Sequence, residues 1–258
     1  MKRVLSDMYF LGRKCIFCNK YGLYKLKDNR VKCKHCKKYY SLTKLKRDLQ
    51  ILYYFYLEVS ARRAANELEI NYNVVHRKFM HFRKCISNYC NNEARKFNGE
   101  LELDESYFGG KRKGNRGRGA RNKTIVFGIL ERKGKVHTVI VQDVSAKTLM
   151  NEIKNKTKKG SVFYTDGWKS YASLEQYGKH NIIDHDKELV NNHNHINGIE
   201  GFWSFAKERF HKYHGISKTN YPFYVKEMEF RFNNRNNNVF KLLIDICIVR
   251  RQFSAELY

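Results

Sequence analysis

The sequence predicts an α/β protein in which a mixed five-stranded sheet with flanking helices follows two smaller modules. Three observations lead to this prediction. Two closely spaced cysteine pairs stand near the N-terminus, helical periodicity then extends to Cys90, and alternating apolar runs typical of strands begin at Leu101. We therefore expect module boundaries at residues 1–44, 45–98 and 99–258.

The composition indicates a folded and strongly basic protein. The 258 residues include 51 Lys and Arg against 25 Asp and Glu, a formal net charge of +26, and 42% of them are hydrophobic. This apolar content suffices to bury a core. So large a positive excess opposes compaction unless a polyanion binds, which favours nucleic acid as the partner. A basic ribosomal or membrane-surface protein is the alternative.

The distribution of apolar residues indicates a protein that stays inside the cell. No apolar run reaches the length of about 18 residues that a membrane span requires, and the N-terminal residues lack the apolar stretch of a secretory signal. We expect the cytoplasm and nucleoid in a prokaryote, or the nucleus in a eukaryote.

Four cysteines have the spacing of a structural zinc site. Cys15 and Cys18 form one pair, and Cys33 and Cys36 form a second pair after fourteen intervening residues. Each pair can chelate from a tight turn while the segment between them forms a hairpin, so we expect tetrahedral Zn²⁺ coordination. Disulfides do not persist in a reducing cell interior. The first module is therefore predicted to be a zinc ribbon, serving as a structural staple or as a grip on nucleic acid or a partner protein.

The second module has the apolar period of helices. Ser60 can cap a short helix, and the pair Ala64 and Ala65 allows close packing against a following helix that begins near Asn71. This pattern predicts a helix-turn-helix whose second helix enters a DNA major groove, with an ordinary three-helix core as the alternative. The candidate DNA contacts on the second helix are Arg77, Lys78 and Arg83.

The first strand of the predicted sheet carries an acidic residue. Asp104 lies in the alternating run Leu-Glu-Leu-Asp-Glu-Ser-Tyr-Phe, and a glycine pair follows where the chain must turn. The next residues mix glycine with cations, so they form either a loop that follows a phosphate backbone or a solvated linker. The candidate DNA contacts in this loop are Lys111, Arg112, Lys113, Arg116, Arg118 and Arg121.

The remaining strands have the order of a ribonuclease H-like sheet. Two alternating runs extend the first strand as a hairpin, and a crossover helix leads to a strand parallel to the first. The expected ranges are 124–131 and 136–143 for the hairpin, 146–156 for the helix, and 161–165 and 181–185 for the last two strands. The fourth strand delivers Asp166 beside Asp104 at the sheet centre, where open α/β sheets bind ligands.

A third carboxylate lies on a predicted helix. Three positions recur at helical spacing and so share one face: Glu200, Trp203 or Ser204, and Lys207. Glu200 can face the two aspartates while Lys207 reaches toward a bound phosphate. Three carboxylates that meet form an oxygen-rich pocket for a hard divalent cation. Two further helices after residue 222 are expected to cover the sheet or to add DNA contacts.

Three strings carry a resemblance to a known family. They are Leu-Asp-Glu-Ser-Tyr-Phe-Gly-Gly-Lys at Asp104, Tyr-Thr-Asp-Gly-Trp-Lys-Ser-Tyr at Asp166, and Asn-Gly-Ile-Glu-Gly-Phe-Trp-Ser-Phe-Ala-Lys at Glu200. Together they resemble the catalytic blocks of DDE transposases, in the insertion-sequence group related to Merlin elements that has an ISXO-type transposase domain. The resemblance covers about residues 100–235 and implies catalysis by the three acids with Lys207.

The third catalytic position has an alternative. Some similar proteins use an asparagine there, and Asn197 stands one helical turn before Glu200. We favour Glu200, because a carboxylate holds a hard cation better than an amide does. Glu105 is the other competitor for this third position, but strand alternation points it away from Asp104.

The resemblance implies metal-assisted phosphoryl transfer. Asp104 would bridge two Mg²⁺ or Mn²⁺ ions, with Asp166 and Glu200 completing one ion each. Hydrolysis would free a 3′-hydroxyl at the transposon end, which would then attack target DNA. The expected partners are double-stranded DNA with terminal inverted repeats, target DNA and further copies of the chain. The alternatives are a catalytically idle or domesticated DNA-binding regulator and a ribonuclease H-type nuclease.

Overall fold

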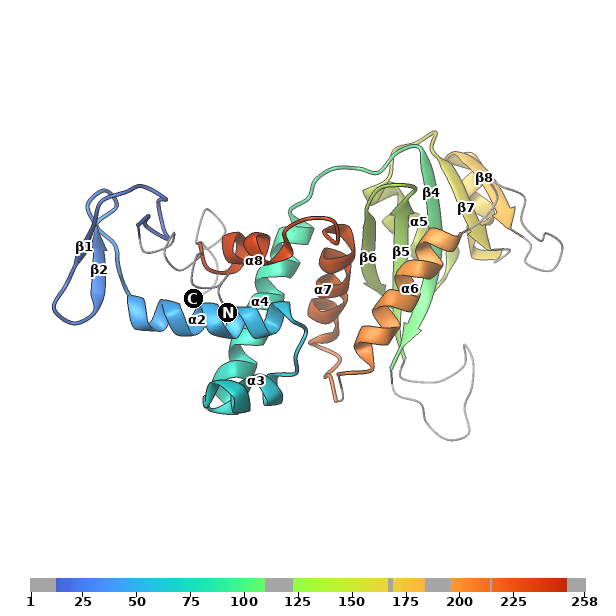
Figure 1. Cartoon of the computed structure of the whole chain (residues 1–258). Coiled ribbons are helices and arrows are strands. Elements are labelled where there is room, and N and C mark those ends of the chain that lie inside the picture. The colour runs from blue at the N-terminus through green and yellow to red at the C-terminus, as the bar shows by residue number, and fades with distance from the viewer. Residues whose placement is uncertain (1–12, 110–122, 167–168, 184–195, 214, 250–258) are drawn as a thin grey trace. The chain divides into compact units, whose positions relative to one another are not determined.

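The computed structural model describes residues 13–109, 123–166, 169–183, 196–213 and 215–249 (Figure 1). The chain divides into two compact units. One comprises Met1–Asn92 together with Asn234–Tyr258, and the other comprises Glu93–Asn233. Among the described helices, none combines the length and the apolar character that crossing a membrane requires.

The described part of the first unit contains a small antiparallel sheet near its N-terminal end. It contains β1 (Leu23–Lys25), β2 (Arg30–Cys33) and β3 (Tyr39–Ser41) in the order β1-β2-β3. In β2, exposed and buried residues alternate, as the period of a strand with one covered face requires. This hairpin-based sheet connects the two cysteine pairs, as the sequence predicted.

Four helices complete the described part of the first unit, and their bounds are α2 (Leu42–Tyr56), α3 (Ala61–Leu68), α4 (Tyr72–Asn91) and α8 (Val239–Cys247). Side chains cap the helix starts: Ser60 Oγ accepts from the Arg63 N–H at 3.2 Å, and Asn71 Oδ1 accepts from the Asn73 N–H at 2.9 Å. The left-handed Glu69 ends α3. The turn between α3 and α4 is therefore short, as in a helix-turn-helix.

The C-terminal helix α8 belongs with the N-terminal helices. It contacts both α2 and α4, and the ring of Phe240 lies 5.7 Å from that of Tyr53 and 5.3 Å from that of Tyr56. The sequence-based boundaries had left residues 234–258 with the sheet. The difference arises because an apolar helix face does not reveal which distant partner covers it.

The second unit contains a mixed five-stranded sheet in the order β6-β5-β4-β7-β8. Neighbouring strands are antiparallel from β6 to β4 and parallel from β4 to β8. The strands are β4 (Glu100–Phe108), β5 (Thr124–Glu131), β6 (Val136–Val141), β7 (Val162–Asp166) and β8 (Lys179–Ile183), and α5 (Ala146–Lys156) crosses from β6 to β7. This is the predicted ribonuclease H-like fold.

Helices cover both faces of this sheet. Leu101 and Leu103 of β4 pack on one face with α5 and with the 3-10 helix η1 (Lys169–Gln176). On the other face, Phe108 packs with α6 (Asn197–Phe210) and with residues of α7 (Tyr221–Asn233). Figure 1 shows α6 lying across β4 and β5. Both faces of β4 are thus covered, so a polar side chain in it needs a partner.

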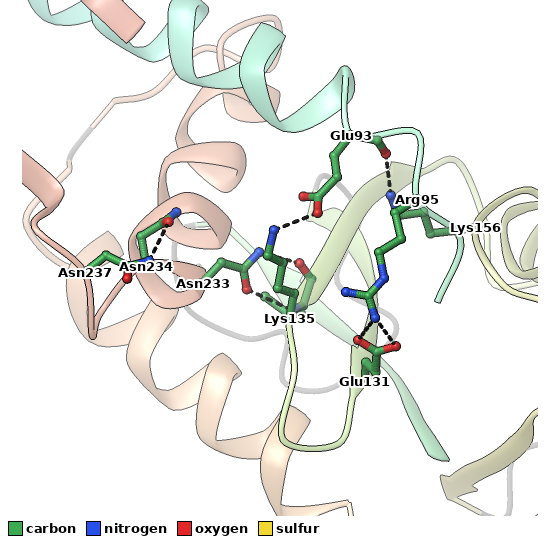
Figure 2. A network of polar contacts seen from close by, with 9 residues as sticks. Glu93, Arg95, Glu131, Lys135, Lys156, Asn233, Asn234 and Asn237 are labelled. Atoms are coloured by element: carbon green, nitrogen blue, oxygen red, sulfur yellow. Dashed lines mark hydrogen bonds and ion pairs between the residues drawn. The ribbon is translucent and has the colours of Figure 1, made fainter. Parts of the chain in front are cut away.

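Polar contacts fix the sheet edge next to α7 (Figure 2). The side chain of Asn233 both accepts from and donates to the backbone of Val136, each at 2.8 Å. Lys135 pairs with Glu93 at 2.7 Å, and Glu131 accepts two bonds from Arg95 at 2.7 and 2.8 Å. These contacts hold the β5–β6 turn against the start and the end of the unit.

Candidate active site and metal centre

Asp104 lies in the middle of β4, opposite Gly128 of β5. It points to the face that α6 covers, where the indole N–H of Trp203 donates to Asp104 Oδ2 at 2.9 Å. A Cβ at position 128 would come within 2.7 Å of the Trp203 ring and 2.9 Å of Ile199. Only glycine at this strand position lets the indole lie low enough to reach the carboxylate.

Asp166 ends β7, the parallel neighbour of β4. The register pairs Glu102 with Tyr164, so Asp104 and Asp166, each two residues further on, continue that register on one face of the sheet. Burial, together with the charges of Glu105 and Asp166, raises the pKa of Asp104 from 3.8 to about 7. A cation beside Asp104 and Asp166 would offset this repulsion, so the two carboxylates have the chemistry of ligands for a divalent metal.

Glu105 lies on the opposite face, as strand alternation predicted. It is buried, and the Tyr171 hydroxyl donates to its Oε2 at 3.1 Å. It therefore acts on Asp104 through charge and does not share the surface under α6.

The first turn of α6 carries Glu200, and both Glu200 and Lys207 are exposed. They lie three residues before and four residues after Trp203, so helix geometry puts them on the side of the helix that reaches Asp104. The flank that packs on α7 is a different one, since Phe202 contacts Phe232 there at 5.2 Å between ring centroids. Asn197, the alternative third position, is the exposed first residue of the same helix.

The three predicted catalytic acids are not gathered as closely as a bound metal would require. Within the described residues, one group of three or more His, Cys, Asp or Glu side chains has all its ligand atoms within 4.8 Å of one another. That group consists of four cysteines and does not include the three acids. Asp104 and Asp166 stand side by side on adjacent strands, and Glu200 lies on the covering helix. Their joint coordination of a cation stays a prediction.

The four cysteines Cys15, Cys18, Cys33 and Cys36 have all their Sγ atoms within 4.8 Å of one another. The Cys15–Cys36 and Cys18–Cys33 separations are both 3.6 Å. Zinc–sulfur bonds of about 2.3 Å in a tetrahedron require sulfurs about 3.8 Å apart, so the cluster fits Zn²⁺.

Matching turns present the two cysteine pairs. The Asn19 N–H donates to the Cys15 carbonyl at 2.8 Å, and the Lys37 N–H donates to the Cys33 carbonyl at 3.1 Å. Asn19 and Lys37 are both left-handed, with φ of 58° and 60°. The repeated geometry shows that each pair is presented by one tight turn, as the sequence predicted.

The predicted DNA contacts on α4 lie in three different environments. Arg77 is exposed. Lys78 forms an ion pair with Asp48 at 2.6 Å. Arg83 is only 3% exposed, and its guanidinium lies 5.3 Å from the centre of the Phe55 ring. The prediction that Arg83 contacts DNA does not fit this position, because its place on the helix turns it toward the core.

Sequence reasoning missed an aromatic and basic group at the start of α4. Tyr72 is 44% exposed, Arg62 lies over its ring at 5.9 Å, and the His76 ring lies 5.6 Å away. The available signal was the position of Tyr72 and His76 in the first turns of α4, directly after the turn, whereas Arg62 lies in α3. The six predicted contacts of the Gly-rich loop, Lys111, Arg112, Lys113, Arg116, Arg118 and Arg121, lie outside the described residues.

A ribonuclease H-like sheet with paired aspartates at its centre, in a chain that also carries a cysteine cluster and a helix-turn-helix, is the organisation of an insertion-sequence transposase. Residues 96–233 match the ISXO2-like transposase domain. The match spans more than half of the chain, which therefore belongs to this transposase family.

The descriptions of two relatives agree with this membership. A Haemophilus influenzae protein described as an uncharacterized transposase-like protein is 44% identical over 103 residues, which cover 40% of this chain and 84% of that protein. An uncharacterized protein in transposable element ISH50 of Halobacterium salinarum is 24% identical over 202 residues. The match covers 71% of this chain and 67% of that protein.

Two solved structures are similar at low identity. The catalytic core domain of BIV integrase has a TM-score of 0.36 and 11% identity, covering 57% of this chain and 95% of the integrase chain. The Mos1 strand transfer complex has a TM-score of 0.30 and 12% identity. The match covers 80% of this chain and 77% of the Mos1 chain.

Proposed function

We propose that this transposase is an active DDE enzyme that cleaves transposon ends and joins the freed 3′-hydroxyl to target DNA. The observation that carries the proposal is the pair Asp104 and Asp166 on one sheet face, with a pKa of about 7 for Asp104 in the absence of a cation. A partly buried carboxylate pair is costly for folding alone, whereas it suits a site that binds metal.

The residues proposed to hold Mg²⁺ or Mn²⁺ are Asp104, Asp166 and Glu200. When bound, two such ions would activate the attacking oxygen and stabilise the leaving oxygen of a phosphodiester. Trp203 holds one oxygen of Asp104 and so fixes the orientation of that carboxylate. Lys207, exposed one to two turns beyond Glu200 on the same side of α6, is proposed to bind a DNA phosphate.

DNA binding is proposed for the helix-turn-helix and the Gly-rich loop. The formal charge of +26 supplies the general attraction for phosphates. At the start of α4, Arg77 and Tyr72 are exposed, and recognition helices contact base edges with their first turns. Two transposon ends must meet for strand transfer, so a dimer or larger assembly is proposed.

Zinc is proposed as a structural ion of the first module. The four thiols come from two turns that are separated by fourteen residues, and the sheet beside these turns has only three short strands. So small a sheet has little core of its own, and metal coordination would supply the missing stability.

The test compares single variants in Mg²⁺-dependent cleavage and strand transfer of end-containing DNA. Asp104→Asn, Asp166→Asn and Glu200→Gln are each expected to lower cleavage by at least about 100-fold while DNA binding is retained. Glu131→Gln, an acid of the adjacent strand on the other face, serves as the matched control and retains cleavage. Asn197→Ala decides between the two candidates for the third position.

Cleavage by Asp104→Asn at the wild-type rate would reject the catalytic assignment. Specific DNA binding by the wild-type chain with no cleavage in Mg²⁺ or Mn²⁺ would indicate the idle regulator. Nicks without strand-transfer products would indicate a nuclease.

A further inference from the structure

A buried carboxylate lies under the start of α6 and takes no part in the proposed metal site. Glu102 precedes Asp104 by two residues, so both side chains leave β4 on the face that α6 covers. The residue is only 1% exposed. Its Oε1 accepts from Arg132 Nε at 3.0 Å, and its Oε2 accepts from the Ile199 N–H at 2.8 Å. Protein donors thus engage both oxygens.

The bond to Ile199 replaces a missing cap on α6. The N-cap residue of this helix is Ile196, which offers no side-chain hydrogen bond to the first turn. Backbone N–H groups at a helix start need acceptors, and a carboxylate there also interacts favourably with the helix dipole. Glu102 supplies both the acceptor and the negative charge from β4, so it ties the first turn of α6 directly to the sheet.

The close approach of helix and strand is built into the sequence. A Cβ at Gly198 would lie 2.8 Å from Glu102 Oε2 and 3.0 Å from Leu130 Cδ2. Any larger residue at position 198 would push the first turn off the carboxylate. The glycine in the string Asn-Gly-Ile-Glu is therefore needed for contact with Glu102.

Arg132 is itself held in place from the neighbouring strand β7. Its guanidinium lies 3.6 Å from the centre of the Tyr164 ring, and the Tyr164 hydroxyl donates to Glu100 Oε1 at 2.7 Å. Tyr164 stands two residues before Asp166. The same group of side chains therefore links the strand of each predicted aspartate to the helix of the third acid.

We infer that Glu102 is a positioning residue: it anchors the first turn of α6, and thereby sets where Glu200 stands relative to Asp104. The inference rests on the proposed function in assigning Glu200 to the metal site. The anchor itself is a structural statement about the Ile199 N–H and can be measured without catalysis.

The experiment combines hydrogen–deuterium exchange of the full chain with Mg²⁺-dependent cleavage of end-containing DNA. Glu102→Ala removes both acceptors, and we expect exchange in residues 197–203 to rise about fivefold or more and cleavage to fall about 10- to 100-fold. The double variant Glu102→Gln with Arg132→Gln keeps an acceptor for the Ile199 N–H without the ion pair. We expect it to restore exchange and cleavage to within about threefold of wild type.

Glu131→Ala is the matched control. It removes an ion pair of similar geometry, with Arg95, from the adjacent strand (Figure 2), but alternation points Glu131 away from α6. Exchange in residues 197–203 should stay at the wild-type level in this variant.

Each other outcome overturns a defined part of the inference. Unchanged exchange in Glu102→Ala refutes the anchor, and raised exchange with unchanged cleavage refutes the positioning role. Loss of cleavage in the double variant as complete as in Asp104→Asn would make Glu102 a chemical participant instead. A wild-type chain that does not cleave at all refutes the proposed function, while the exchange result still decides the anchor.

Discussion

Replacing Asp104 by Asn is predicted to stabilise the metal-free sheet unit at alkaline pH. The folded carboxyl has a pKa of about 7, raised from 3.8 by burial and by the charges of Glu105 and Asp166. Because the folded state binds the proton more tightly, the stability linked to this group is fully present below pH 3.8 and is lost as the pH rises through 7. Asn cannot ionise and still offers an acceptor to Trp203.

The size of the effect follows from the two pKa values. The ionisation of Asp104 costs the folded state about 4 kcal/mol at pH 8 and about 2 kcal/mol at pH 5, as upper estimates. The free energy of unfolding of Asp104→Asn should therefore exceed that of wild type at pH 8. The difference between variant and wild type should be smaller by about 2 kcal/mol at pH 5. Mg²⁺ should restore stability to wild type and not to the variant, if the proposed site binds it.

The assay is urea unfolding in a chelator, followed by tryptophan fluorescence. Trp168 and Trp203 are the two tryptophans of the chain, and both lie within Glu93–Asn233, so the signal reports this unit. Asp143→Asn is the control of opposite sign. Hydrogen bonds from Ser145 and Thr148 lower the pKa of Asp143, so its removal should destabilise the unit at pH 8.

Two results would refute this reasoning about Asp104. One is a variant that is less stable than wild type at pH 8 without metal. The other is a stability difference that does not change between pH 5 and pH 8, since a difference of that kind would not come from proton binding.

The other predictions concern the cysteine cluster, the helices and the helix–sheet contact. Cys36→Ser should release zinc, measured by a colorimetric chelator, without changing the tryptophan-detected unfolding. Arg77→Ala should weaken DNA binding, and the slope of the log binding constant against log salt concentration should fall by about 1. Arg83→Ala should destabilise the helical unit by about 1–3 kcal/mol in circular dichroism melts. Gly128→Ala should displace Trp203, shift its emission and cost about 1–3 kcal/mol.

Alternation and chain order sufficed to predict the sheet and its aspartates. A period of two assigns Asp104 and Glu105 to opposite faces, and a crossover helix makes the strand of Asp166 a parallel neighbour. These are local patterns with few alternatives, and the structure has both. The cysteine cluster was predictable for the same reason, because its geometry depends on two short turns.

Contacts between distant residues could not be predicted in this way. The run Glu-Leu-Glu-Leu-Asp-Glu gives Glu102 no mark that separates it from an exposed strand acid, and its role depends on Arg132 and Ile199 far along the chain. Arg83 resembled a DNA contact because charge alone suggested exposure, whereas its helical position faces Phe55. No local pattern indicates that Gly128 is required, because the Trp203 ring that packs on it lies 75 positions later.

The packing of α8 on α2 and α4 has a consequence for biosynthesis. The helical unit is discontinuous in sequence, since the whole sheet unit lies between α4 and α8. During translation its N-terminal helices emerge first, yet the side chains around Tyr53 and Phe82 stay uncovered until the ribosome has made α8. Premature termination after the sheet unit would therefore leave a helical module that contains its helix-turn-helix residues but cannot complete its core.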